Sequence, residues 1–224
     1  MLAALAAGGL WAGAAAWLRV QLGVNEILTT LMANFIAVFL MQWLVHGPWR
    51  SREGFPYSDT VAESLWLPYL APPLHIGIIL ALVLSPLLYF LLFYTTLGYQ
   101  IRAVGADALA ARFAGMRLGR TVLVAVLISG AAAGLAGAVE VLGVRHSLRD
   151  EITGPNYGYV AIAVALLARS SPLWVPLSAL FFGTLLAASV SLHVVLADGT
   201  ENLIIGVLIM VLLLLERGIE RARQ

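Results

Sequence analysis

The chain has 224 residues, of which 61% are apolar and 11% are charged, whereas soluble domains average about 45–50% apolar and about 25% charged. A compact globule of this length cannot hide so much apolar surface from water, so the chain is predicted to lie in a membrane. It contains no Cys and no Lys and has a formal charge of +1, which excludes thiolate metal sites, a lysine-dependent phosphate loop and a general attraction to nucleic acid.

Seven apolar segments are predicted to be membrane helices, which makes the chain an all-α polytopic membrane protein. A span needs about 20 mainly apolar residues, and backbone in lipid must satisfy its own hydrogen bonds, which favours helices. The segments cover residues 1–18, 24–46, 74–97, 121–143, 158–168, 173–193 and 203–215. By length they form one transmembrane domain over 1–224, with a polar loop at 47–73 and an arginine-rich loop at 98–120.

The fifth segment, 158–168, is too short to cross a bilayer by itself. Its length is about 16 Å at about 1.5 Å per residue, roughly half of a ~30 Å hydrocarbon core. Two interpretations stay open. Either the polar flanks Asn156, Tyr157 and Arg169 lengthen an ordinary crossing, or the segment is a half-helix of a broken span. Broken spans are tolerated where they pack in protein or line a wet cavity, which points to a transport path.

The arginines predict the orientation, since cytoplasmic loops carry an excess of basic residues. Loop 98–120 contains four arginines and the C-terminal tail contains three. If both are inside, alternation places nine of the 13 arginines and the C-terminus in the cytoplasm, and loop 47–73 outside. Met1 then begins a span at the outer surface without a charged anchor, so we expect that further helices precede it.

Catalytic and metal-binding patterns are absent from the sequence. The four His lie at or near predicted helix ends without metal-ligand spacing. There is no nucleophile elbow and no close pair of carboxylates within a span. The chain is therefore predicted not to be an enzyme, with no catalytic residues, no metal and no cofactor of its own.

Polar side chains near the start of the second span form one candidate site. Glu26, Thr30 and Asn34 are four residues apart, and each such step turns a helix face by only about 40°. Polar groups in a membrane face protein or water, so this stripe is a candidate translocation path. The alternative is that Glu26 is a first-turn acid favoured by the helix dipole, with Thr30 and Asn34 bonding neighbouring helices.

The fourth span contains a second candidate site and a packing motif. Ser129 and Glu140 lie within about 20° of each other on one helix face; Glu140 either meets a polar solute or pairs with Arg145. A glycine series on the same span predicts close approach of another helix. The series consists of Gly130, Gly134 and Gly137.

The loop at 98–120 is predicted to contain a short amphipathic helix. Asp107 is a suitable N-cap for a helix through Arg112, and Gly115 is a suitable residue just beyond its end. A short exposed helix of this kind fits a groove on a partner protein. The alternative is an arginine-bearing turn that only determines topology.

The sequence of this loop, IRAVGADALAARFAGM at 101–116, resembles the cytoplasmic loop of permease subunits of bacterial ABC importers. The resemblance is to the branch that handles ribose-type sugars, branched-chain amino acids and nucleosides. Three further stretches agree in order, at 24–37, 129–143 and 158–186. The start of the second span and the end of the fourth are most similar to the nucleoside and simple-sugar members. Members usually carry further helices before the region that matches residues 1–20.

The resemblance implies a permease subunit in a bacterial plasma membrane that imports nucleosides or a related sugar-bearing solute by alternating access. Its implied partners are ABC ATPase subunits that bind ATP, a second permease subunit, an extracytoplasmic solute-binding protein or lipoprotein, and membrane lipid. Matched by position, the ATPase-coupling residues are Arg102, Gly105, Asp107, Ala110, Ala111, Arg112 and Gly115. A permease for ribose-type sugars or branched-chain amino acids is the alternative within the class, and an ion-coupled secondary transporter is the alternative outside it.

Overall fold

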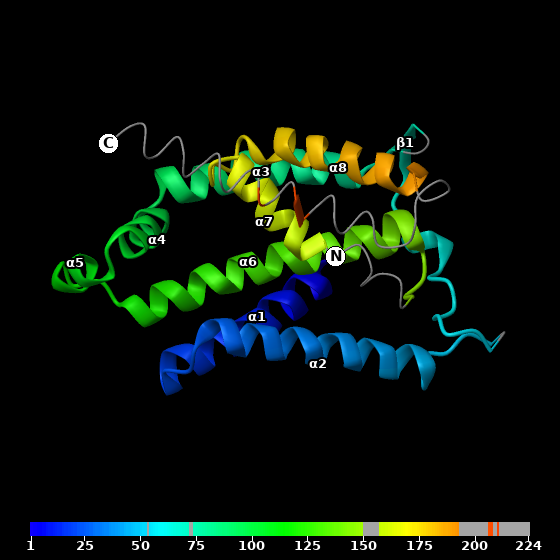
Figure 1. Cartoon of the computed structure of the whole chain (residues 1–224), viewed down its shortest axis with the longest axis horizontal. Coiled ribbons are helices and arrows are strands. Elements are labelled where there is room, and N and C mark those ends of the chain that lie inside the picture. The colour runs from blue at the N-terminus through cyan, green and yellow to red at the C-terminus, as the bar shows by residue number, and fades with distance from the viewer. Residues whose placement is uncertain (53, 72–73, 150–156, 193–205, 208–209, 211–224) are drawn as a thin grey trace. The chain divides into compact units, whose positions relative to one another are not determined.

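The computed structural model describes residues 1–52, 54–71, 74–149, 157–192, 206–207 and 210. These residues form eight α-helices and one two-stranded sheet (Figure 1). Their contacts divide the chain into two compact units. The first unit is Met1–Leu80 with Phe90–Gly154, and the second is Ala81–Tyr89 with Pro155–Gln224.

Four helices have the length and the apolar composition of membrane spans. They are α1 (Leu2–Leu22), α2 (Glu26–His46), α3 (Gly77–Tyr94) and α6 (Leu118–Glu140), the last continuing into the π-helical turn η2 (Val141–Arg145). Two shorter apolar helices follow, α7 (Tyr157–Leu167) and α8 (Val175–Leu192). The first six predicted spans therefore correspond to helices, and the seventh, 203–215, lies outside the described residues except for 206, 207 and 210.

The first unit is organised around α6, with α1 packed antiparallel along it. α1 ends at Gly23, which is left-handed (φ 65°) and directs its N–H to the Arg19 carbonyl at 3.0 Å. Asn25 then caps α2 by accepting the Ile27 N–H at 2.9 Å. A glycine stop and an asparagine start, two residues apart, reverse the chain into α2.

At one end of α6 lie two short helices, α4 (Thr96–Ala106) and α5 (Ala108–Phe113), and at the other lies the segment 47–76 (Figure 1). That segment contains the 3₁₀ turn η1 (Glu63–Leu65) and the antiparallel strands β1 (Tyr69–Ala71) and β2 (Leu74–His75). We call these the α5 end and the β1 end of the first unit. The α5 end includes the α1–α2 turn, because the Cγ1 of Val20 would lie 2.7 Å from a Cβ atom placed on Gly119.

One boundary differs from the sequence-based prediction. Residues 98–106 were expected in a loop, and residues 96 and 97 at the end of the preceding span. Residues 96–106 instead form α4, because Thr95 accepts the Gly98 N–H at 3.1 Å and caps a new helix. At Gly98 the backbone approaches the carbonyl oxygens of Leu91 and Leu92 too closely for any Cβ. The bend therefore depends on glycine at this position.

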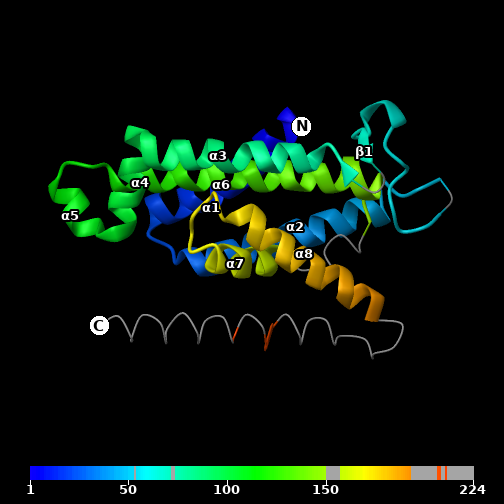
Figure 2. The same ribbon diagram turned by 90° about the horizontal axis from the view of Figure 1, so that it is seen from above.

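In the second unit α7 and α8 are neighbouring helices, coloured yellow and orange in Figure 2. Their core consists of Val160, Ala163, Val164 and Phe182. The Ser85 hydroxyl, in the middle of α3, donates to the Pro172 carbonyl at 2.6 Å. Arg169 and Ser170 both have positive φ, so α7 does not continue through Arg169, one of the flanks expected to lengthen it. Asn156, the flank on the other side, lies outside the described residues.

Candidate functional site

The glycines of α6 form a close helix contact with α1. A Cβ atom on Gly8 would lie 2.7 Å from the Gly134 Cα, and one on Gly130 would collide with the Ala12 Cβ. A Cβ at Gly137 would meet nothing within 4 Å among the described residues. Among the described residues, the close contact with α1 is therefore formed at Gly130 and Gly134.

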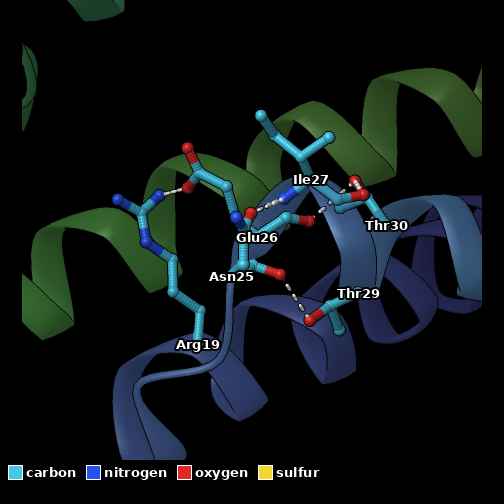
Figure 3. Close-up of polar contacts among 6 residues, drawn as sticks. All are labelled: Arg19, Asn25, Glu26, Ile27, Thr29 and Thr30. Carbon is cyan, nitrogen blue, oxygen red and sulfur yellow. Dashed lines mark hydrogen bonds and ion pairs between the residues drawn. The ribbon is translucent and has the colours of Figure 1, made fainter.

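Glu26, the first residue of the predicted polar stripe, forms an ion pair with Arg19 across the α1–α2 turn (Figure 3). Both side chains are about half exposed, at 50% and 45%. The pair joins the last turn of α1 to the first turn of α2. This geometry matches the alternative interpretation of Glu26 as a first-turn acid and provides a partner for it that the stripe analysis did not consider.

The remaining stripe residues are exposed in this chain. The Thr30 hydroxyl donates to the carbonyl oxygens of Glu26 at 2.8 Å and Ile27 at 3.1 Å, on its own helix (Figure 3). Asn34 is exposed. The most apolar part of α2 is also unburied. The stripe therefore lies on a helix whose other neighbours are lipid or protein outside the described residues.

α5 is formed by strong local signals at both of its ends. The Asp107 carboxylate accepts the N–H groups of Leu109 at 2.8 Å and Ala110 at 3.0 Å, as predicted. Gly115 is left-handed (φ 83°) and donates to the Arg112 carbonyl at 3.0 Å, while Met116 donates to the Ala111 carbonyl at 3.1 Å. The two bonds form a Schellman motif, which ends the helix.

The short helix presents an exposed apolar face. Leu109 and Phe113, four residues apart, are 64% and 85% exposed, and Arg112 between them is also exposed. Of the predicted coupling residues only Ala111 is buried, and it holds the helix to the unit. These two side chains are therefore available for contact with another protein.

Two other predicted coupling residues lie on α4. The Arg102 guanidinium lies over the Phe93 ring, 4.6 Å from its centroid. A Cβ on Gly105 would meet nothing within 4 Å, and its φ is not positive. The fold of the described residues therefore does not require glycine at position 105.

The β1 end is closed by contacts within the chain. Segment 47–76 forms backbone hydrogen bonds with the end of α6 and the residues after it, such as Val61 N–H to the His146 carbonyl at 2.8 Å and Leu67 N–H to the Leu142 carbonyl at 3.0 Å. His146, left-handed at φ 57°, stacks on Trp66 with 3.9 Å between ring centroids. Sequence reasoning placed the four His only at or near predicted helix ends and did not predict this stack.

Glu140, the second candidate carboxylate, pairs with Arg145. The Nε of Arg145 is 3.4 Å from Oε1 of Glu140, and the side chains are 30% and 21% exposed. Ser129 is exposed and about 16 Å away along α6. The structure thus does not bring Ser129 and Glu140 together. Of the two interpretations of Glu140, the pairing with Arg145 is the one observed.

Within the part of the chain that the structure describes, no three His, Cys, Asp or Glu residues are close enough to hold a metal ion. The ion pairs of the described residues lie at the two ends of the first unit, and one of these ends carries the exposed, capped helix α5. Residues 1–213 match the family of branched-chain amino acid transport system permease components. The chain belongs to this permease family. The family is one of transport components, and this permease is a multi-pass membrane protein.

Curated relatives include sugar and nucleoside permeases. The permease is 36% identical over 206 residues to a glucose ABC transporter permease of Haloferax volcanii, covering 86% of this chain and 54% of the relative. It is 31% identical over 221 residues to a guanosine ABC transporter permease of Bacillus subtilis, covering 96% and 62%. A nucleoside ABC transporter permease of Lactococcus lactis is 29% identical, with 75% and 49% covered. The chain thus spans about half the length of these relatives. No solved structure matches it.

Sequence reasoning missed two sets of residues at the α5 end. Arg19 was used only as an orientation signal, although Gly23 and the Asn25 cap place it beside Glu26. Arg117 and Arg120 were treated as loop charges, although they line a groove with Arg102. The tight turn between the first two predicted helices could have indicated that Arg19 lies near Glu26. The spacing of three residues between Arg117 and Arg120 could have indicated that they share one side of a helix.

Proposed function

We propose that this chain is the transmembrane permease subunit of an ATP-driven ABC importer for nucleosides or a related sugar-bearing solute. Its membership of the permease family and the names of its relatives support the class. The observation that carries the proposal is α5, capped at both ends and exposing Leu109 and Phe113 where the family resemblance places the ATPase contact.

In the proposed mechanism ATPase subunits seat α5 in a groove, and their ATP-driven closure moves it. The Asp107 cap and the Schellman motif keep α5 rigid, so a push on Phe113 is transmitted through Met116 to the start of α6. α6 carries α1 with it because their backbones are in contact at Gly130 and Gly134. The spans then expose the solute path alternately to the two sides of the membrane.

The coupling experiment compares two substitutions of Asp107. Asp107→Asn keeps an acceptor that can cap α5, and we expect unchanged uptake and ATP hydrolysis in the assembled transporter. Asp107→Ala removes the cap, which typically costs about 1 kcal/mol, and we expect ATP hydrolysis with reduced uptake. Equal, wild-type uptake in both variants, measured with radiolabelled solute in vesicles, would contradict a coupling role for α5.

The orientation is part of the proposal, with the α5 end and the C-terminus in the cytoplasm. Because the chain has no Cys, single cysteines report topology without background. Phe55→Cys at the β1 end is expected to react with a membrane-impermeant maleimide in intact cells. Phe113→Cys is expected to react only after permeabilisation. Labelling of position 113 in intact cells would overturn the orientation.

The second candidate function is import of a simple sugar. The glucose permease of Haloferax volcanii favours it, being 36% identical over most of this chain. Competition of a labelled nucleoside by unlabelled guanosine, ribose or glucose separates the two candidates. We expect guanosine to compete most strongly, and exclusive competition by glucose would favour the sugar permease.

An ion-coupled mechanism receives no support from the carboxylates near the spans. In the described portion of the chain, Glu26 and Glu140 are both ion-paired with arginines. We therefore expect uptake to require ATP and the partner ATPases. Uptake driven by a proton or sodium gradient without those partners would overturn the ABC assignment.

A further inference from the structure

A groove at the α5 end of the first unit lies between the α3–α4 bend and the beginning of α6. It has a volume of about 960 Å³, and three arginines line it: Arg102 from α4, and Arg117 and Arg120 from the start of α6. No carboxylate belongs to its described lining. Figure 1 shows α4 and α5 beside this end of α6. We call it the arginine groove.

The neighbouring carboxylates are occupied elsewhere. Asp107 caps α5 through two backbone N–H groups, and Glu26 pairs with Arg19. Arg102, Arg117 and Arg120 form no ion pair with any described residue, whereas Arg52 and Arg145 at the β1 end each have a carboxylate partner. Three guanidinium groups in one concave surface repel one another, and a bound anion removes this repulsion.

The groove lies at the end of two membrane spans. α3 ends at Tyr94 and α6 begins at Leu118, so the arginines lie within a turn or two of apolar helices long enough to cross a bilayer. Tyr94 and Tyr99 also line the groove and are mainly exposed. Tyrosine and arginine in this position are typical of the headgroup layer. Arg102 is held over the Phe93 ring at 4.6 Å, which orients its guanidinium.

We propose that the arginine groove binds the headgroup of an anionic phospholipid. The phosphate would be held by charge-assisted, bidentate hydrogen bonds from guanidinium groups, a geometry that lysine does not reproduce. The acyl chains would lie along the apolar surface where α3 ends and α6 begins. Basic pockets at the ends of membrane helices bind anionic headgroups through the same chemistry. The proposal requires only that the permease is in a membrane and does not depend on its solute, although Arg102 and Gly115 of the groove are also among the residues matched to ATPase coupling.

The test uses the full chain, purified in detergent with any partner subunits that copurify, and native mass spectrometry. Phosphatidylglycerol and phosphatidylcholine with identical acyl chains are titrated in parallel. We expect phosphatidylglycerol to bind at least about tenfold more tightly, since each basic residue near an anionic headgroup contributes about fivefold. Equal affinity for the two lipids would overturn the proposal.

The decisive variant is Arg102→Gln/Arg117→Gln/Arg120→Gln. Its affinity for phosphatidylglycerol is expected to fall at least about tenfold, with binding of phosphatidylcholine unchanged. The matched control, Arg50→Gln/Arg52→Gln/Arg149→Gln, removes the same charge at the β1 end and is expected to change either affinity less than about twofold. An equal loss of affinity for phosphatidylglycerol in both variants would show that net charge alone causes the lipid preference, and it would overturn the proposal.

Three further arms exclude misfolding and other anions. Arg102→Lys/Arg117→Lys/Arg120→Lys keeps the charge and is expected to recover part of the lipid preference, which a misfolded protein would not do.

Inorganic phosphate and glycerol 3-phosphate are expected not to displace the lipid, and displacement by either at equal concentration would identify a soluble-anion site instead. If the glutamine variant keeps its lipid preference but no longer copurifies with an ATPase, the occupant is an acidic protein segment and the proposal is wrong.

Discussion

The two ends of the first unit use their arginines in opposite ways. At the β1 end Arg52 and Arg145 pair with carboxylates, Arg50 bonds to the Gly54 carbonyl, and Arg149 lies over Tyr57. At the α5 end only Arg19 has a carboxylate partner, and four other arginines lack one among the described residues. The arginines Arg50, Arg52, Arg145 and Arg149 of the β1 end thus have partners within the chain, whereas most arginines of the α5 end have no carboxylate partner among the described residues, and that end also exposes Leu109 and Phe113. An end of the first kind stabilises the fold, and an end of the second kind is suited to binding other molecules.

The largest expected effect tests the binding character of the α5 end. Phe113→Ser removes the most exposed large side chain of α5, and we expect uptake to fall about tenfold or more, as for an aromatic residue central to an interface. Stability should change by less than about 0.5 kcal/mol because the side chain has few contacts within the chain. Phe55→Ser at the β1 end is the matched control, with uptake expected near wild type. Equal losses at both positions would remove the difference between the ends.

The next effect tests the structural character of the β1 end. Trp66→Ala removes the stack on His146 and the hydrogen bond from Nε1–H to the Val61 carbonyl at 2.9 Å. We expect a loss of about 2 kcal/mol in stability for this half-buried ring and its bond, measured as a lower thermal midpoint. Trp49→Ala, an exposed Trp of the same segment, should cost less than about 0.5 kcal/mol. An unchanged midpoint for Trp66→Ala would show that segment 47–76 is not held by this stack.

A smaller effect distinguishes the two interpretations of Glu140. If it serves only its pair with Arg145, Glu140→Gln should cost at most about 1 kcal/mol, since the pair is partly exposed, and should leave the KM of uptake unchanged. A several-fold increase in KM at constant stability would instead favour contact with the solute. Arg145→Gln is the matched variant, because it breaks the same pair from the other side.

The smallest effect concerns the ion pair between Arg19 and Glu26 at the α5 end. Arg19→Gln and Glu26→Gln should each lower stability by about 0.2–1 kcal/mol, because both side chains are half exposed and well screened. The charge-reversed double variant Arg19→Glu/Glu26→Arg should recover part of that loss in a double-mutant cycle. Additive losses would show that the ion pair contributes nothing to the turn.

Local signals explain why much of this protein was predictable. Asp107 and Gly115 specify α5 with contacts no more than five residues apart, so cap chemistry alone locates the helix. The long spans follow from continuous apolar runs in the same way. The helix α4 was missed because the bend before it depends on Gly98 approaching the carbonyl oxygens of Leu91 and Leu92, a contact that the sequence does not display.

By itself the sequence determined that this is a polytopic helical membrane protein, where most of its helices lie, and that α5 is capped, since apolar length and capping act within a few residues. Only the tertiary structure decided which polar groups meet. It brought Arg19 to Glu26, placed Gly130 and Gly134 against α1, and gathered Arg102, Arg117 and Arg120 around one groove. These outcomes depend on where helices end and where they cross. Two side chains on different helices meet only when the helices place them at the same height, and the periodicity of one helix does not contain that information.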